Sequence, residues 1–289
     1  MAVRIPRPNL AMQSPMPTAN WPAVVAMRAE DHQALVQAWQ RLEHPSLAAR
    51  LTSKLGVSIE KFFELLPDGW YSSMHSAIQR SLQKSLDIAI FSLGKQPARA
   101  RRRRYHNVIS ALSGAAGGVF GLPSVLAELP LTSTLILRSV ADIARNEGED
   151  LNALETRLAC MEVFALGGRS RADDAAETGY YGIRLALAMH FSTISERVAA
   201  QGIVKWSPPG LVRLIAEISA RFGVVVTQKA AAQMVPILGA ATGAVVNLIF
   251  LEHFQEIARA HFTIRRLERA YGEEFIRRQY LSLTQKLAI

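Results

Sequence analysis

The sequence predicts an all-α protein, a single multi-helix domain with two glycine-rich helices packed at its centre. Apolar residues recur at helical spacing through most of the 289 residues. Residues 110–150 and 236–272 share one design, in which small residues are followed by bulky apolar ones and then by a charged helix ending at glycine. The only hint of a strand is the valine triplet at 224–226, which is too short to build a sheet.

Length and composition are those of a folded globular chain. A chain of 289 residues can bury a large core, and an apolar content of 49% excludes global disorder. Cys160 is the single cysteine, so it cannot form an internal disulfide, and it fits a reducing compartment. Residues 1–20 are rich in proline and lack an apolar run long enough for a signal peptide. We expect a disordered tail there, followed by one helical domain over residues 21–289.

Three helices are expected in the first third of the chain. Apolar spacing predicts the first over residues 21–43, before a break at His44-Pro45. Ser46 is suited to N-cap a second helix that ends near Leu66. Residues 67–69 read Pro-Asp-Gly and form a turn, and a third helix follows over residues 70–93.

The middle of the chain contains the first glycine-rich stretch, at 105–127, which has no charged residue. We expect its helix to break at 128–130, because proline lacks the amide donor that a helix interior needs. An amphipathic helix then ends at Gly148. Asn152 and Glu155 form a capping-box pattern that begins the next helix, which ends at 167–168.

The last third is predicted to contain four helices. The two shorter ones cover residues 180–200 and 211–222, separated by a loop with two prolines. The longest begins within the second charge-free stretch, at 230–251, and ends at Gly272. Residues 273–287 form the final helix. On the longest helix, one face holds Gly239, Gly243, Asn247, Phe250, Phe254, Ile257, His261, Ile264 and Glu268.

Both charge-free stretches are long enough to span a bilayer, but they consist mainly of small residues. Such residues allow helices to approach closely, so buried helices of a soluble or peripheral protein are the main interpretation and membrane insertion is the alternative. The G-x-x-x-G pairs that we assign to helix packing are Gly114 with Gly118, Gly117 with Gly121, and Gly239 with Gly243.

The net charge of +9 comes mostly from one local cluster. Lys95 and five arginines, with no acid among them, supply six of these charges; the arginines are Arg99, Arg101, Arg102, Arg103 and Arg104. A solvated loop is one interpretation of this run. Contact with an anionic membrane surface is another, at about 1 kcal/mol per basic residue. We expect no nucleic-acid partner, because the run lacks aromatic residues and a wider basic face.

No catalytic motif stands out, so the candidate site residues are isolated polar groups in apolar surroundings. Glu128 lies between the first glycine-rich stretch and Pro130, where a buried carboxylate needs a partner, and Arg138 or His261 would serve. Glu128, Asn247 and His261 are the catalytic candidates. Arg138, Asp142, His253 and Arg265 are the polar binding or structural candidates. We expect no metal, because Glu252 and Glu256 point away from His261 on a straight helix, and no cofactor.

Two blocks of the sequence resemble the EcsC family of bacterial proteins. The first is GGVFGLPSVLAELPLTSTLILRSVADIARNEGED, and the second is PILGAATGAVVNLIFLEHFQEIARAHFTIRRLERAYG. The resemblance implies a bacterial, mainly helical protein. It also implies the associations of the family's namesake, which is linked genetically to an ABC-transporter operon and has been labelled hydrolase-like.

These observations lead to two function hypotheses. The first is an accessory or interaction protein that is peripheral at the inner face of the cytoplasmic membrane and supports a transporter. The alternative is a hydrolase with a polar site of Glu128, Arg138, Asn247 and His261. The sequence does not indicate an oligomeric state.

Overall fold

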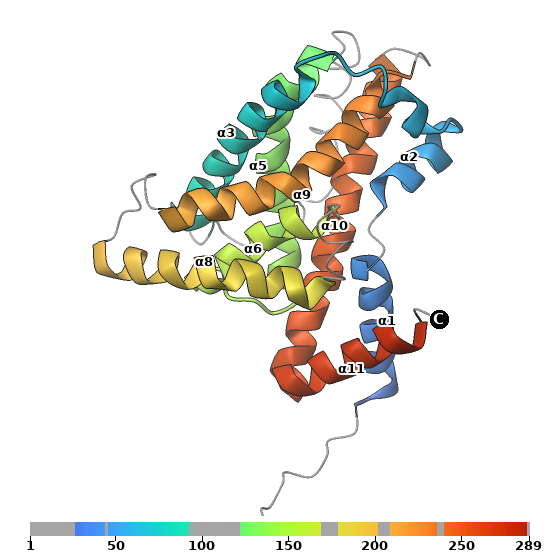
Figure 1. The fold of residues 1–289 in the computed structure, drawn as a ribbon. Helices are drawn as coiled ribbons and strands as arrows, with labels where there is room; N and C mark the ends of the chain where they lie inside the picture. The colour runs from blue at the N-terminus through green and yellow to red at the C-terminus, as the bar shows by residue number, and fades with distance from the viewer. Residues whose placement is uncertain are drawn as a thin grey trace, which may run out of the picture.

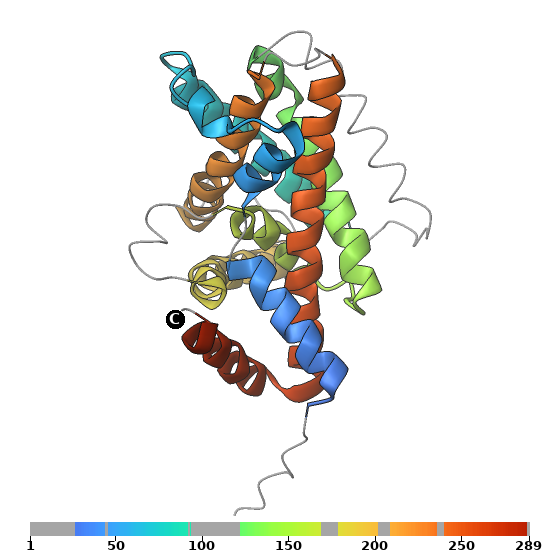
Figure 2. The ribbon, with the colours of Figure 1, turned by 90° about the vertical axis from the view of Figure 1, so that its right-hand side faces the viewer.

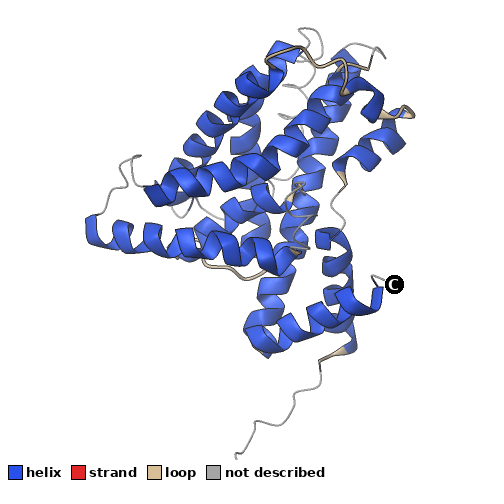
Figure 3. Ribbon diagram, in the orientation of Figure 1, coloured by secondary structure: helices blue, strands red, loops and turns tan. Residues whose placement is uncertain are grey.

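The computed structural model describes residues 27–43, 46–91, 93, 122–168, 179–201, 209–235 and 240–287. These residues form helices joined by turns and contain no strand, which confirms the all-α fold class (Figure 3). The elements are α1 (Ala29–Glu43), α2 (Leu47–Leu55), the 3-10 helix η1 (Ile59–Phe62), α3 (Trp70–Phe91), α5 (Leu122–Asn146), α6 (Leu154–Leu166), α8 (Tyr180–Gln201), α9 (Pro209–Gln233), α10 (Ala240–Tyr271) and α11 (Glu273–Leu287).

Helix α10 is the axis of the fold. It runs through the middle of the molecule and contacts α1, α2, α5, α6, α9 and α11 (Figures 1 and 2). The face expected from the sequence is buried at Gly243, Asn247, Phe254 and His261. Because partners surround the helix, other sides of it are buried too, including Leu251.

Most of the remaining helices form three groups beside α10. Helices α3, α5 and α9 pack against one another in the upper half of Figure 1. Helices α6 and α8 lie across the lower left of that view, whereas α1 and α11 lie beside the C-terminal half of α10. The apolar side chains of all these helices form one continuous core.

Two expected breaks are absent, because tertiary packing outweighs local propensity. Helix α5 continues through Pro130, where the sequence predicted an interruption. Leu129 and Ile136, on either side of the proline, are both fully buried, so packing holds both halves in line. Helix α9 likewise continues through Gly223 and the valine triplet, of which Val225 and Val226 are buried. A valine in a helix costs well under 1 kcal/mol, which burial offsets.

Two other boundaries differ from the prediction. The expected helix over 46–66 starts at the Ser46 cap but ends at Gly56, whose φ of +69° is the left-handed conformation of a helix terminus. Residues near the expected end form η1 instead. Asn152 does not cap α6; its amide binds the Asp150 carboxylate, and the N-cap is Ala153.

Most glycines of the expected helix pairing lie outside the described residues. This applies to Gly114, Gly117, Gly118, Gly121 and Gly239, whereas Gly243 is buried on α10. The tail at 1–20 and all five arginines of the basic run also lie outside. Within the described parts of the chain, no helix combines the length and apolar character needed to cross a bilayer.

Candidate functional site

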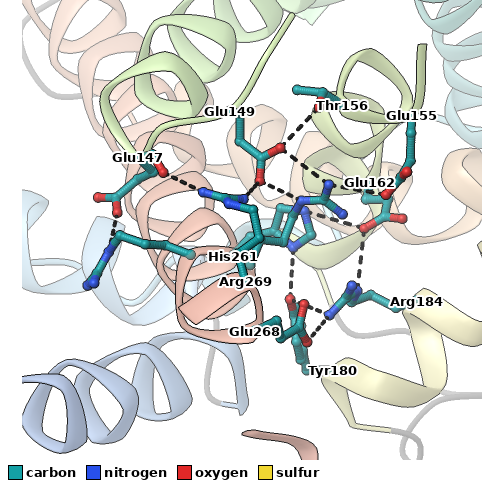
Figure 4. Close-up of polar contacts among 12 residues, drawn as sticks. Glu147, Glu149, Glu155, Thr156, Glu162, Tyr180, Arg184, His261, Glu268 and Arg269 are labelled. Carbon is teal, nitrogen blue, oxygen red and sulfur yellow. Dashed lines mark hydrogen bonds and ion pairs between the residues drawn. The ribbon is translucent and has the colours of Figure 1, made fainter. Parts of the chain in front are cut away.

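Two ion-paired arginines join the long helix to the α5–α6 connection (Figure 4). The Arg265 guanidinium lies 2.8 Å from the Glu149 carboxylate and 3.3 Å from that of Glu155. Arg269 also pairs with Glu149. Glu149 comes from the first sequence block and both arginines come from the second, so the two blocks meet here.

Helix α8 adds a third arginine to the same region. Arg184 donates to the Glu268 carboxylate at 2.7 Å and lies over the ring of Tyr180, 5.4 Å from its centroid. Its Nε is 3.9 Å from Glu162 Oε2. The start of α8 is fixed by Glu43, which accepts a hydrogen bond from the backbone amide of Tyr180. Arg184 is therefore held in place from two sides.

A hydrogen-bond chain behind this site reaches His261. Arg184 donates to the Tyr180 hydroxyl at 3.3 Å, and that hydroxyl is hydrogen-bonded to His261 Nδ1, 3.0 Å away. The other ring nitrogen, Nε2, lies 3.4 Å from Glu162 Oε2. Burial lowers the pKa of His261 well below its usual value, helped by Arg184 and Arg265. His261 is therefore neutral.

Glu162 is the group in this region that changes its protonation state near neutral pH. Its residue is only 6% exposed, and burial raises its pKa to about 7 against the attraction of Arg184 and Arg265. Its Oε2 atom makes no hydrogen bond to any described residue. A carboxyl group in this state exchanges its proton near neutral pH.

Glu162 lines a pocket of about 650 Å³ between α6, α8 and α11. Leu158, Leu185 and Phe191 form an apolar wall, and Arg184 and Arg265 lie on the polar side. A pocket of this size with a mainly apolar lining and a few polar groups is typical of a small-molecule site. It is the candidate functional site of the described chain.

The structure places Glu128 elsewhere and corrects its expected partner. Neither Arg138 nor His261 pairs with it; Lys229 of α9 does. Lys229 has 0% exposure, and its ammonium lies 4.9 Å from the centroid of Phe250. Arg138 lies ten residues beyond Glu128 on α5, about 15 Å along the helix at 1.5 Å per residue. The ion pair therefore fixes α5 to α9 and not to α10.

The other catalytic candidates do not converge either. Asn247 and His261 are both buried on α10, but fourteen residues separate them, which is about 21 Å along a helix. Asp142 pairs with Arg145 within α5 at 3.1 Å, and Arg138 is half-buried on the same helix. The structure thus brings His261 and Arg265 to the pocket region and leaves the other candidates apart.

His253 has a structural contact. Its Nε2 lies 2.6 Å from the carbonyl oxygen of Gly167, so this nitrogen donates the proton. Burial lowers the pKa of His253 to about 4, which keeps the ring neutral. The histidine therefore ties α10 to the end of α6.

Metal-ligand and thiol chemistry find no support among the described residues. No group of three or more His, Cys, Asp or Glu side chains there is arranged to hold a metal ion. Cys160 is fully buried, and burial raises the pKa of its thiol far above the usual range. A thiol of this kind is unreactive.

Sequence reasoning missed Glu162, Arg184 and Lys229. Glu162 and Arg184 are isolated charges in otherwise apolar stretches, CMEVF and GIRLAL, and Lys229 is the one charge in TQKAAA. A lone charge of this kind on a buried helix needs a partner from another helix. This pattern could have identified the three residues from the sequence. The partners of these three residues could not be predicted from the sequence, because they lie far away in the chain.

These features define an all-helical protein with an amphipathic pocket that is bordered by buried ion pairs. The chain belongs to the EcsC protein family, whose model matches residues 19–267. Comparisons with curated proteins and with solved structures gave no match.

Proposed function

We propose that the protein is a bacterial accessory protein that attaches peripherally to the inner face of the cytoplasmic membrane. The observation that carries this proposal is an uncharged face on α8. Leu185 and Met189 are each 66% exposed and lie one turn apart. Ala188 and Ser192 are exposed beside them, and we call these four residues the α8 outer face; all of them except Met189 also line the open pocket. Exposed apolar side chains at helical spacing are suited to the interfacial region of a bilayer.

The α8 outer face supplies only part of the binding free energy in this proposal. Burying a Leu or Met side chain stabilises by about 1.5–3 kcal/mol, and one third of each is already covered, so the pair contributes roughly 2–4 kcal/mol. The five arginines of the basic run add about 1 kcal/mol each near anionic lipid. The proposed attachment is therefore reversible and depends on salt.

The transporter partner implied by the family resemblance is part of the same proposal. A protein that samples the membrane surface through weak contacts is brought to integral membrane proteins by its location. In-cell crosslinking from the α8 outer face, with Leu185 replaced by a photoreactive residue, identifies the partner. We expect crosslinks to lipid and to membrane proteins.

Vesicle flotation tests membrane attachment. We expect the full chain to float with vesicles that contain anionic lipid and to be released at 1 M salt, where the Debye length is about 3 Å. The double variant Leu185→Gln/Met189→Gln should bind vesicles at least tenfold more weakly, because it removes the apolar contact.

A matched control separates this contact from a general loss of apolar surface. Leu65, between η1 and α3, is 59% exposed, and Leu65→Gln should leave vesicle binding unchanged. If wild type stays unbound, or if the double variant floats as well as wild type, the proposal is wrong. Retention at 1 M salt, with release by detergent alone, would indicate insertion and contradict peripheral attachment.

A hydrolase is the second candidate function, and Glu162 is the observation that favours it. A general acid or base works best with a pKa near the working pH, which Glu162 has. However, the pocket offers no activated nucleophile among its described residues: the Ser192 hydroxyl donates to the Met189 carbonyl oxygen at 3.0 Å. Ester or phosphoester turnover that Glu162→Gln abolishes would establish this function over that of a binding protein.

A further inference from the structure

The charged groups around the pocket contain one carboxylate too many. The arginine–glutamate network consists of Glu149, Glu155, Glu162 and Glu268 with Arg184, Arg265 and Arg269. Six of these seven side chains form an ion pair with an N···O distance of 3.3 Å or less. Glu162 is the exception, because its nearest guanidinium nitrogen is 3.9 Å away. The network thus has four carboxylates for three guanidinium groups, and Glu162 is the surplus one.

The neighbours of Glu162 do not supply the missing positive charge. His261 is neutral, because burial lowers its pKa well below the usual value. Arg184 and Arg265 are held by their own carboxylates. At the rim of the pocket, Glu273 and Arg277 are four residues apart on α11 and of opposite charge, so together they add no net charge. Without a ligand, Glu162 therefore holds a proton below about pH 7, the value to which burial raises its pKa.

The pocket leaves room for a larger cation at the same place. Glu162 lines the cavity of about 650 Å³, and the apolar side chains of Leu158, Leu185 and Phe191 face the same space. An apolar body fits this wall, and a positively charged donor fits the surplus carboxylate. An anionic head group, by contrast, would add a fifth negative charge to a network that already has one in excess.

We propose that this pocket binds organic cations that combine an apolar body with an ammonium group, and that the ammonium takes the place of the proton on Glu162. The ammonium donates to the Glu162 carboxylate, and the apolar body packs against Leu158, Leu185 and Phe191. Binding forms no covalent bond and releases the proton of Glu162 to solvent. Leu185 belongs both to this pocket and to the α8 outer face, so the inference is tested in solution, where no membrane is present.

The test is a titration of the full chain in solution with n-octylammonium, monitored by isothermal calorimetry between pH 5 and pH 8.5. The ammonium stays charged throughout, because aliphatic amines have pKa values near 10. Binding should be tightest above pH 7 and should weaken about tenfold per pH unit below the pKa of Glu162, since one proton must leave. Octanoate, an anion of the same chain length, should not bind.

Two variants assign the effect to Glu162. Glu162→Gln should weaken octylammonium binding at least tenfold at pH 8 and remove its pH dependence. Glu274→Gln makes the same exchange on α11 outside the pocket lining and the network, where the side chain is 70% exposed, and should retain both the affinity and its pH dependence. The melting temperature of each variant reports whether it folds, and the wild-type pH profile tests the proposal without any variant.

Three outcomes would overturn the proposal. One is no octylammonium binding by wild type at pH 8. Another is equal binding by wild type and Glu162→Gln. The third is preferential binding of octanoate that tightens at low pH, which would assign the pocket to anionic amphiphiles. Because no vesicle is present, each of these outcomes leaves membrane attachment to be judged by flotation alone.

Discussion

Replacing Glu128 with leucine is expected to lower the free energy of unfolding by about 3–5 kcal/mol, because it leaves the ammonium of Lys229 buried without a carboxylate. Lys229 has 0% exposure, so it cannot turn to water in the native state. Burial already lowers the pKa of Lys229, against the attraction of Glu128. Loss of that attraction leaves the cost of burial uncompensated.

Restoring the charge balance should restore stability. The double variant Glu128→Leu/Lys229→Met removes both charges and should recover most of the loss, since apolar replacements of buried ion pairs are often neutral or stabilising. Urea denaturation measures both variants. Glu274→Leu is the control, because Glu274 and Arg278 are each 70% exposed and 3.8 Å apart, so its effect should stay within about 0.5 kcal/mol. A loss below 1 kcal/mol for Glu128→Leu would contradict a buried, charged Lys229 that depends on Glu128.

Two glycines should respond in opposite directions to the same substitution. In Gly168→Ala, the new Cβ lies 2.6 Å from the carbonyl oxygen of Arg221 and 2.7 Å from Val225 Cγ2. The backbone and a stiff β-branched side chain cannot move far to relieve the clash. We therefore expect the free energy of unfolding to fall by about 1–3 kcal/mol or more. In a chain of this size, this lowers the melting temperature by roughly 2–10 °C.

Gly223→Ala is the matched control for this clash. Its Cβ would lie 3.6 Å from Met74 Cε and 3.7 Å from Ile78 Cδ1, which is ordinary van der Waals contact. Because Gly223 is inside α9, alanine should stabilise the helix by up to about 1 kcal/mol. Thermal unfolding of the two variants therefore gives shifts of opposite sign. An unchanged melting temperature for Gly168→Ala would contradict the close approach of α6 to α9.

The described helices were largely predictable, because amphipathic spacing and glycine termini are local signals. Gly148 and Gly272 end their helices with φ values of +81° and +90°, as expected. The errors at Pro130 and Gly223 have a common cause. Both residues weaken a helix locally, and contacts made by buried neighbours such as Leu129 and Phe222 outweigh that weakness.

The candidate site was less predictable than the helices. His261 was recognised as a polar residue set into an apolar face, and Arg265 as a polar candidate. Their partners, Glu162 and Glu149, lie about a hundred residues earlier in the chain. Helical periodicity does not report which helices become neighbours. The same limit explains why Glu128 was assigned to Arg138 or His261 when its partner is Lys229.

The most direct test of the pocket assignment is the titration of Glu162 in the free protein, followed by ¹³C NMR of its carboxyl carbon. Glu162→Gln assigns the signal. Because burial disfavours the charged form and no guanidinium binds this carboxylate closely, we expect a midpoint near pH 7. A midpoint near 4.3, the value for an unperturbed glutamate, would contradict a surplus carboxylate in the pocket.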